Sequence, residues 1–244
     1  MTARPTNLTL SVVSHGQGHL IRHLLEDIRT AHSATFEIIL TLNIPEDTGF
    51  LASFTDLPLV VIPNPTPKGF GANHNAAFER SRSDIFVIVN PDIRALELDL
   101  GRLVDLTRSP GIGAMAPRIL SAQGRLEDSA RRFPTVPRLA ARVLLRRRAP
   151  DYDLDNAGPV QVDWVAGMFV AFPRKAFAAV NGFDERYFMY MEDVDICRRL
   201  GQKGFSVCVD TRMSVVHDAQ RASRRNLRHL GWHARSAIRY LLGI

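Results

Sequence analysis

The chain has 244 residues, of which 45% are hydrophobic, so it can bury the core of one large α/β domain and is not a disordered protein. Its net charge is +6 at pH 7. Residues 129–150 contribute +7 and residues 218–244 contribute +5, which leaves −6 for the rest of the chain. The basic character is therefore local, and it borders an acidic body.

Two cysteines, Cys197 and Cys208, are too few for a disulfide framework and favour a reducing compartment, the cytoplasm. The first seven residues lack the apolar region of a secretory signal. No apolar run approaches the ~18 residues that a membrane-spanning helix needs. We expect a cytoplasmic protein that at most lies on a membrane surface.

The first half of the chain alternates strand-like and helix-like patterns. Strands are predicted at Leu8–Ser14, Phe36–Leu42, Leu57–Ile62 and Asp84–Asn90, and helices at residues 20–28, 72–82 and 98–108. This alternation predicts an α/β sandwich with a mainly parallel central sheet whose two faces are covered by helices.

The second half is less regular. Strands are predicted at Ile112–Pro117, Val162–Phe172, Phe205–Asp210 and Met213–His217, and helices at Arg174–Val180, Asp193–Leu200 and Arg221–Leu242. An arginine-rich excursion separates the first two of these strands. The last helix is basic and amphipathic, with an apolar stripe formed by Leu227, Leu230, Ala234, Ala237, Ile238 and Leu241. It is suited either to an anionic lipid surface or to packing on the domain.

Polar residues stand at the ends of three of the predicted strands. They are Ser14-His15, Asn43 to Asp47, and Asn90-Pro91-Asp92. Ligands of open parallel sheets bind outside the carboxyl ends of the strands, so these residues are candidate ligand contacts. Helix capping and turn formation are the alternative for each segment taken alone. The glycine turn after Ser14 does not complete a dinucleotide fingerprint, because position 21 is Ile.

Three carboxylates, Glu192, Asp193 and Asp195, follow an aromatic and methionine-rich run at a predicted helix start. A carboxylate beside apolar surface can have a raised pKa and act as a general base. Capping of the helix N-terminus is the competing interpretation. A lone histidine, His217, ends the last predicted strand and is a candidate metal ligand.

Nine motifs occur in a fixed order from Leu8 to Ser223. They are the first strand with Ser14-His15; Asn43 to Asp47; Lys68 to Asn75; Ile88 to Asp92; Arg131 to Thr135; Val162 to Gly167; Asn181 to Glu185; Tyr190 to Arg199; and Val215 to His217. Together they resemble the inverting family 2 glycosyltransferases of the GT-A fold, and especially the rhamnosyltransferase-like bacterial branch.

This resemblance implies a role for each matching residue. Asp92 and His217 would hold a divalent cation, Mn²⁺ or Mg²⁺, on the diphosphate of the donor. Asp193 would be the general base, with Glu192 beside it, and Trp164 and Gly167 would form part of the acceptor wall. The nucleotide-sugar contacts would be Ser14, His15, Asn43, Asp47, Lys68, Gly69, Phe70, Asn75 and Asn90.

Two departures from the family pattern bear on the donor. Leu42 stands where the family commonly has the Asp that reads uracil, and Asn90 stands at the first position of the DXD motif. They favour dTDP-rhamnose, with a UDP-hexose next. The acceptor is expected to be a cell-surface glycan or a lipid-linked sugar. The resemblance implies one GT-A domain over residues 1–220, with a nucleotide-binding half at 1–117 and an acceptor-binding half at 118–220, followed by the helix at 221–244.

Two other classes of function compete with this one. The arginine-rich segments are compatible with a nucleic-acid-binding protein, although the acidic body and the lack of a recognised binding motif argue against nucleic acid as a partner. A catalytically inactive sugar-binding relative is the other alternative, which the intact Asp92, Asp193 and His217 disfavour. The sequence leaves the oligomeric state open.

Overall fold

The structure is a computed structural model that describes residues 7–30, 35–96, 98–138, 150–155, 158–218 and 227–243. The strands are β1 (Leu8–Ser14), β2 (Phe36–Leu42), β3 (Leu59–Pro63), β4 (Ile85–Val89), β5 (Ile93–Arg94), β6 (Ile112–Ser121), β7 (Ala130–Arg131), β8 (Pro159–Val162), β9 (Trp164–Val165), β10 (Phe169–Pro173) and β11 (Ser206–His217). The helices are α1 (Gly18–Thr30), the 3₁₀ helix η1 (Gly49–Phe54), α2 (Phe70–Arg80), α3 (Leu100–Thr107), α5 (Arg174–Ala179), α6 (Glu192–Gln202) and α7 (Leu227–Leu242). None of the described helices is long and apolar enough to cross a bilayer.

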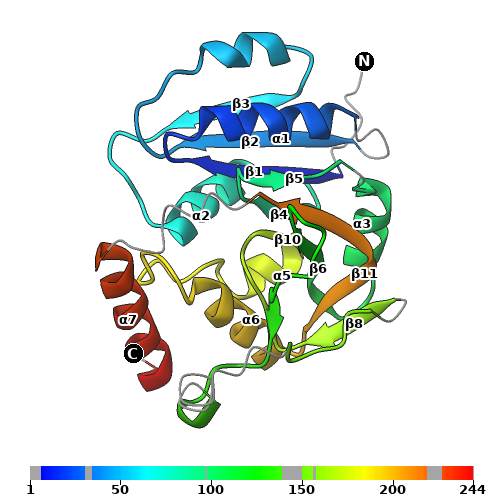
Figure 1. The fold of residues 1–244 in the computed structure, drawn as a ribbon, viewed down its shortest axis with the longest axis vertical. Helices are drawn as coiled ribbons and strands as arrows, with labels where there is room; N and C mark the ends of the chain where they lie inside the picture. Colours follow the sequence, from blue (N-terminus) through cyan, green and yellow to red (C-terminus); the bar gives the residue numbers. More distant parts are fainter. Residues whose placement is uncertain are drawn as a thin grey trace.

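The predicted α/β fold is confirmed. Within the described residues, nine strands form one sheet in the order β3-β2-β1-β4-β10-β6-β11-β5, with β8 paired to β11 (Figure 1). The strands β1 to β4 run parallel, with Ser14 opposite Leu42, Leu42 opposite Pro63, and Val12 opposite Val89. This register brings the carboxyl ends of the four strands to one edge, as the sequence predicted.

The other half of the sheet is more mixed than the sequence predicted. Strand β10 runs antiparallel to both β4 and β6, and β5 and β8 run antiparallel to β11. The predicted division at residues 117/118 falls inside β6, which pairs with β10 and β11. The two halves therefore share one sheet, and the domain organisation stays a prediction.

The single strand predicted at Val162–Phe172 is wrong, because this segment contributes to three different pairings. β8 pairs with β11, β9 pairs with β7, and β10 pairs with β4 and β6. The chain leaves β8 at Asp163, whose carboxylate accepts hydrogen bonds from the amide of Phe133 (2.8 Å) and the hydroxyl of Tyr152 (2.8 Å). A tight turn then separates β9 from β10, because the amide of Met168 donates to the carbonyl of Ala166 (2.7 Å).

The two strands predicted at Phe205–Asp210 and Met213–His217 are in fact one strand, β11. Its register against β6 shifts between Asp210 and Ser214, which is an irregularity of the β-bulge kind. Asp210 is fully buried there and accepts hydrogen bonds from Nε (2.6 Å) and Nη2 (3.1 Å) of Arg102 on α3. Polar residues inside the strand therefore mark this bulge, which the apolar pattern alone presents as a break.

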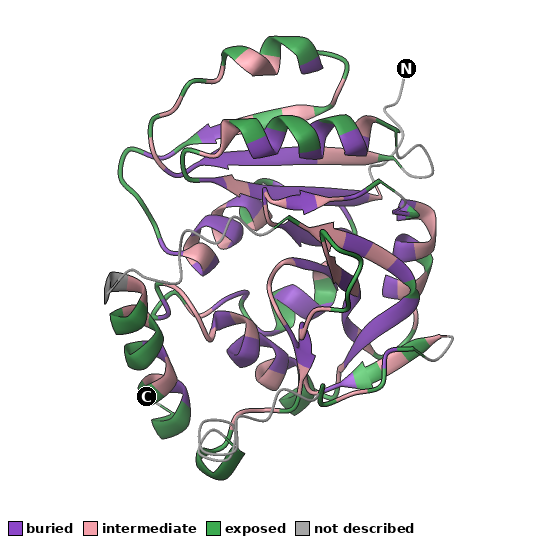
Figure 2. Ribbon diagram, in the orientation of Figure 1, coloured by how far each residue is buried: buried purple, intermediate pink, exposed green. Residues whose placement is uncertain are grey.

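The pleat of the sheet divides the apolar side chains between two cores. In β4, Ile85, Val87 and Val89 pack with α1 and α3, whereas Phe86 and Ile88 pack with α2, α5 and α6. Successive strand residues point to opposite faces, so a continuous apolar run buries both faces of the sheet. Figure 2 shows the central strands of the sheet, including β4, as buried almost throughout.

A cluster of phenylalanines fills the second core around Phe177. Its ring lies 4.6 Å from that of Phe78 on α2, 5.3 Å from Phe86 on β4, 5.2 Å from Phe172 on β10 and 5.5 Å from Phe183. Aromatic rings at these separations add edge-to-face attraction to the burial of their apolar surface. The cluster ties the sheet to the helices on the face that carries α6.

We predict that Phe177→Ala lowers the free energy of unfolding by about 4 kcal/mol and the Tm by about 10 °C, because it leaves a cavity among four rings. Urea titration and a thermal scan measure the effect. Val60→Ala on the edge strand β3, where the side chain is 45% exposed, is the control and is expected to change stability by less than ~0.5 kcal/mol. Equal stabilities of the two variants would contradict this description of the core.

Candidate active site

The polar residues predicted at the strand ends lie at the carboxyl edge of the sheet. The amide of Asn43 donates to the carbonyl of Ser14 (2.8 Å), and the amide of Asn64 donates to the carbonyl of Leu42 (2.9 Å). The buried hydroxyl of Ser14 accepts from the amide of Gln17 (3.2 Å) and so supports the turn into α1. The ends of β1, β2 and β3 thus form one continuous rim.

Three buried asparagines shape the loop between β3 and α2. Oδ1 of Asn43 accepts from Nδ2 of Asn64 (3.0 Å) and from the amide of Lys68 (2.8 Å), while its Nδ2 donates to the carbonyl of Lys68 (3.0 Å). Asn73 accepts from Asn64 (2.7 Å) and donates to the carbonyl of Gly69 (3.0 Å). This network fixes the backbone of the loop and leaves the Lys68 side chain exposed at the rim. Asn64 was not among the predicted site residues, and its only signal in the sequence is an asparagine in a proline-rich loop.

An open cavity of about 430 Å³ lies beside this rim, lined by the first turn of α1 and by residues 46–50. Asp47 borders the cavity and caps the turn into η1, where its Oδ1 accepts from the amide of Gly49 (2.8 Å). His15 is exposed next to Asn43, with 3.4 Å between its Nδ1 and the Nδ2 of Asn43. The predicted nucleotide contacts at the ends of β1 and β2 are therefore neighbours.

Two glycine positions bring α2 and the loop before it against the segment before α6. The amide of Phe70 donates to the carbonyl of Phe188 (2.9 Å), and a Cβ on Gly69 would lie 2.7 Å from that carbonyl oxygen. Gly182 has φ +64°, and a Cβ there would lie 2.4 Å from Oδ1 of Asn75. The side-chain amide of Asn75 exchanges two hydrogen bonds of 2.9 Å with the backbone of Phe183. Asn75, predicted to contact the nucleotide, thus has an evident role in joining these two segments.

The acidic run predicted as a helix start lies at the first turn of α6. Tyr190 and Met191 both adopt left-handed backbone conformations, with φ 72° and 68°, immediately before the helix. Asp195 forms ion pairs with Arg198 (3.3 Å) and Arg199 (2.7 Å), so it supports the helix. Neither Glu192 nor Asp193 forms an ion pair with another described residue.

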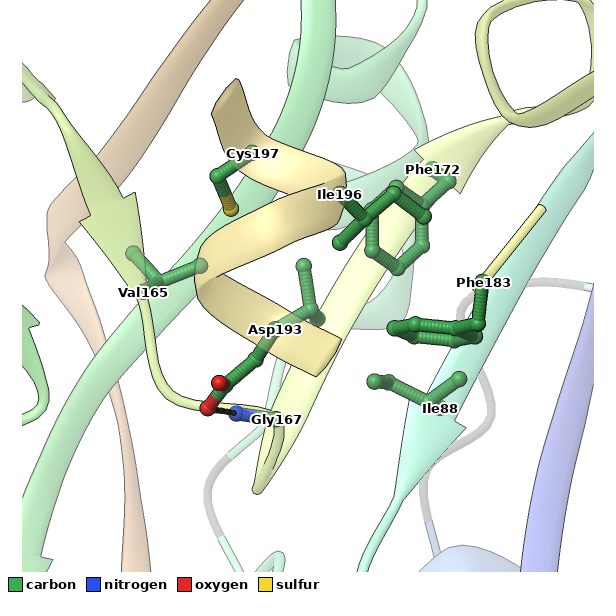
Figure 3. A pocket seen from close by; sticks show the side chains of 9 residues that line it. Ile88, Val165, Gly167, Phe172, Phe183, Asp193, Ile196 and Cys197 are labelled. Carbon is green, nitrogen blue, oxygen red and sulfur yellow. Dashed lines mark hydrogen bonds between the residues drawn. The ribbon is translucent and has the colours of Figure 1, made fainter. Parts of the chain in front are cut away.

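Asp193 is held in place by backbone amides. Its Oδ2 accepts a hydrogen bond from the amide of Gly167 (3.1 Å), and its Oδ1 accepts from the amide of Val194 (2.9 Å). Figure 3 shows the carboxylate directed at the turn between β9 and β10. Behind it, Ile88, Val165 and Phe183 help to line an apolar crevice with no room for a water molecule.

The surroundings of α6 raise the pKa of both carboxyls at its start. Burial is the main cause for Glu192, which is 6% exposed, and the charge of Asp193 adds to it. Burial also raises the pKa of Asp193, whereas the amide hydrogen bonds and the charge of Arg131 act against the increase. Oε2 of Glu192 is buried without a hydrogen-bond partner in the described part of the chain. Two neighbouring carboxyls with raised pKa values are typical of an acid–base site.

His217 lies between two carboxylates. Its Nε2 is 3.2 Å from Oδ2 of Asp92, and its Nδ1 is 2.8 Å from Oε2 of Glu127. The hydrogen bond to Asp92, and after it the one to Glu127, raise the pKa of His217 to about 9 although partial burial opposes this. The structure therefore brings together Asp92 and His217, as predicted. It adds Glu127, which was not predicted because it lies in an irregular segment without a recognisable pattern.

Because Asp92 and Glu127 contact opposite nitrogens of one ring, their carboxylates do not converge on a common point. Accordingly, the described residues contain no group of three or more His, Cys, Asp and Glu side chains that could hold a metal ion by itself. Oδ1 of Asp92 is buried, and no described residue offers it a hydrogen bond. One carboxylate oxygen and one imidazole nitrogen are thus the protein atoms available at this position.

A single turn connects this position with Asp193. The amide of Asn90 donates to the carbonyl of Met168 (2.8 Å), and the preceding residue, Gly167, donates its amide to Asp193. Trp164 lies just before this turn and packs with Tyr187, Val194 and Tyr240. The loop that carries Asp92 and the helix that begins with Glu192 and Asp193 are therefore held to one turn.

Comparison with known proteins supports an enzyme of sugar transfer. A family model described as the N-terminal domain of galactosyltransferase matches residues 157–220, the part of the chain that includes Trp164, Gly167, Asp193 and His217. An N-acetylglucosaminyl-diphospho-decaprenol L-rhamnosyltransferase of Mycobacterium tuberculosis is 29% identical over 96% of this chain and 83% of its own length. The rhamnosyltransferase WbbL of Escherichia coli is 28% identical over 94% of this chain and 90% of its own.

The fold is also similar to that of a solved structure. A mannosyltransferase of Pyrobaculum calidifontis, solved with GDP-mannose and Mn²⁺, superposes with a TM-score of 0.66 at 18% identity, covering 97% of this chain and 65% of its own. The protein is a glycosyltransferase with the GT-A fold. Within this glycosyltransferase, the matched region begins just before β8 and ends after β11, so it contains both Asp193 and His217.

Proposed function

We propose that this glycosyltransferase moves a sugar, with inversion, from a nucleoside-diphosphate sugar to a hydroxyl group of the acceptor. The observation that carries the proposal is the turn at Gly167 and Met168. It joins the loop that holds Asn90 and Asp92 to the carboxylate of Asp193 through two hydrogen bonds. A donor diphosphate beside Asp92 and an acceptor hydroxyl beside Asp193 would then meet across this turn.

Asp193 is proposed as the general base. As the acceptor oxygen attacks the anomeric carbon, its proton passes to the carboxylate, and the bond between that carbon and the diphosphate oxygen breaks on the opposite face. The nucleoside diphosphate leaves with the bonding electrons, and the configuration at the anomeric carbon inverts. A positioned base of this kind typically contributes ~10²–10⁴ to the rate. The hydrogen bonds from Gly167 and Val194 fix the carboxylate for this step.

The acceptor would bind over the start of α6. Glu192 presents one buried carboxylate oxygen without a partner in the described structure, which a sugar hydroxyl can satisfy. Trp164 lies next to the same helix, packed against the cluster that contains Val194. Gly167 lets the Phe70 ring pack closely beside this turn, because a Cβ there would come within 3.3 Å of that ring.

A divalent cation fits the atoms at Asp92 and His217. The unpartnered Oδ1 of Asp92 would offer one hard oxygen, Nε2 of His217 would offer one imidazole nitrogen once the cation displaces its proton, and donor phosphate oxygens would complete the coordination. This donor set suits Mn²⁺ or Mg²⁺, and the imidazole favours Mn²⁺. When bound, such a cation neutralises charge that develops on the leaving diphosphate. Glu127 would orient the ring of His217 through Nδ1.

For the donor we propose dTDP-rhamnose, with a UDP-hexose as the second choice. The two relatives compared above are rhamnosyltransferases, and one of them is named for a lipid diphosphate acceptor. Leu42 stands at the end of β2, where a carboxylate would otherwise be available to a uracil ring. The acceptor is accordingly proposed to be a lipid-linked or cell-surface glycan.

We predict that Asp193→Asn lowers kcat by ~10²–10⁴ and leaves the Kd of the nucleotide-sugar unchanged, because only proton removal from the acceptor is lost. Steady-state transfer kinetics and calorimetric titration of dTDP-rhamnose measure the two quantities. Asp84→Asn, at an exposed carboxylate before β4, is the matched control and is expected to transfer at the original rate. Full turnover by the Asp193→Asn variant would remove Asp193 from the mechanism.

The raised pKa values of Glu192 and Asp193 predict the pH dependence of transfer. The base must be ionised, so kcat should rise with pH through an apparent pKa above the ordinary aspartic range of about 4. Burial and the charge of Asp193 raise the pKa of Glu192 to about 8, so Glu192 is still protonated when Asp193 ionises, and Glu192→Gln should leave this limb of the kcat profile in place. Profiles of both enzymes measured in one buffer series give the comparison, and a limb displaced to lower pH in Glu192→Gln would contradict this order of ionisation.

For the cation we predict that Glu127→Ala weakens Mn²⁺ binding in the presence of dTDP by ~10–100-fold, because the His217 ring loses the partner that orients it. Electron paramagnetic resonance of free Mn²⁺ measures the affinity. Glu127→Gln retains an acceptor for Nδ1 and should lose less, and Glu79→Ala, at an exposed residue of α2, should lose nothing. Unaltered affinity in Glu127→Ala would show that Glu127 has no part in cation binding.

A further inference from the structure

The terminal helix α7 packs on the protein through a polar and aromatic face. His229 Nδ1 lies 2.8 Å from the hydroxyl of Tyr190, and Ser236 Oγ donates to the carbonyl of Met189 (2.9 Å). The ring of Trp232 lies 5.0 Å from that of Phe188, and buried Tyr240 lies beneath the guanidinium of Arg198 at 4.4 Å. These positions follow helical spacing, so one face of α7 is fully used by the domain.

The opposite face of α7 carries the aliphatic residues and is exposed. Leu230 is 67% exposed, Ile238 57%, Leu241 38% and Leu242 66%. Ala234, also exposed, completes the stripe at spacings of three and four residues. Figure 2 shows this outer face of α7 as predominantly exposed. The sequence left two interpretations of the helix open, and the structure is compatible with both, because packing on the domain uses residues other than the aliphatic stripe.

The charge of the region indicates what covers this stripe. Arg235 is exposed beside the aliphatic stripe, and residues 218–244 contain six arginines against the single acidic residue Asp218. A second copy of the chain would bring two positive regions together. A surface of anionic lipid headgroups would instead complement the arginines while the aliphatic side chains enter the boundary of the acyl chains.

The position of α7 gives such a contact a use. The helix lies at the edge of the molecule against the segment from Arg186 to Tyr190, which leads directly into Glu192 and Asp193 (Figure 1). The carbonyl of Phe188 in this segment also accepts the amide of Phe70 at the start of α2. A lipid surface bound by the outer face of α7 would therefore lie close to the acceptor side of the candidate site.

We propose that the outer face of α7, formed by Leu230, Ala234, Ile238, Leu241 and Leu242 and bordered by Arg235, binds the surface of an anionic lipid bilayer. The helix lies in the plane of the interface, with its aliphatic stripe buried and the arginine at the headgroups. Binding is reversible, because a single short helix buries few aliphatic side chains. The lipid contact itself does not depend on the proposed function. Only its role, which is to bring the enzyme to a lipid-linked acceptor, rests on that function.

Flotation of the full chain with vesicles tests the proposal. Wild-type protein should float with phosphatidylcholine vesicles that contain phosphatidylglycerol and much less with phosphatidylcholine alone. The double variant Leu230→Gln/Ile238→Gln should lower the partition coefficient ~10-fold or more, because two exposed aliphatic side chains no longer enter the bilayer. Arg235→Gln should lower binding about fivefold on anionic vesicles only.

Leu96→Gln is the matched control, since Leu96 is 64% exposed at a position outside α7, and it should float like wild type. Circular dichroism and dTDP-rhamnose binding establish that each variant is folded. Equal flotation of wild type and the double variant, or no flotation of wild type, would overturn the proposal. A wild-type dimer in light scattering that the double variant abolishes would assign the face to a second copy instead. Flotation without transfer activity would refute the proposed function and leave the lipid contact standing.

Discussion

The site depends on the hydrogen bonds at two successive residues, Gly167 and Met168. The carbonyl of Met168 holds the amide of Asn90 at the end of a parallel strand, and the amide of Gly167 holds Asp193 at the start of a helix. These two strand and helix ends are far apart in the sequence, and the turn between β9 and β10 joins them. Because β10 runs antiparallel beside β4, its beginning lies at the carboxyl edge of the sheet, where the donor-side loops also end.

The surroundings of Asp193 and Glu192 disfavour charge on these groups, whereas those of His217 favour positive charge. This difference suits a transfer between a charged donor and a neutral hydroxyl. At Asp193 and Glu192, burial raises the pKa values and favours a group that can accept a proton. At His217, two carboxylates stabilise positive charge. The acidic body of the chain would thus hold a cation where the proposed diphosphate would lie, while the excess of positive charge is confined to residues 129–150 and 218–244.

Much of this arrangement could be predicted from the sequence. The strands before Ser14, Asn43 and Asn90 are short apolar runs that end abruptly, so both the strands and the polar residues after them were predictable. The role of Glu127 was not, because it contacts His217 across 90 positions and its own segment has no periodicity. The division of Val162–Phe172 into three strands was not predictable either, since an apolar run does not indicate which neighbouring strand each residue pairs with. For α7 the pattern correctly predicted an amphipathic helix, yet the aromatic and polar side chains, rather than the aliphatic ones, pack on the domain.

The central claim is that the position at Asp92 and His217 receives the donor diphosphate and its cation, opposite Asp193. Anomalous diffraction from crystals grown with dTDP and Mn²⁺ tests it most directly. We expect one strong manganese peak bonded to a carboxylate oxygen of Asp92, to Nε2 of His217 and to the diphosphate, with dTDP at the ends of β1 and β2. A manganese peak away from Asp92 and His217, or dTDP bound elsewhere on the sheet, would contradict the account.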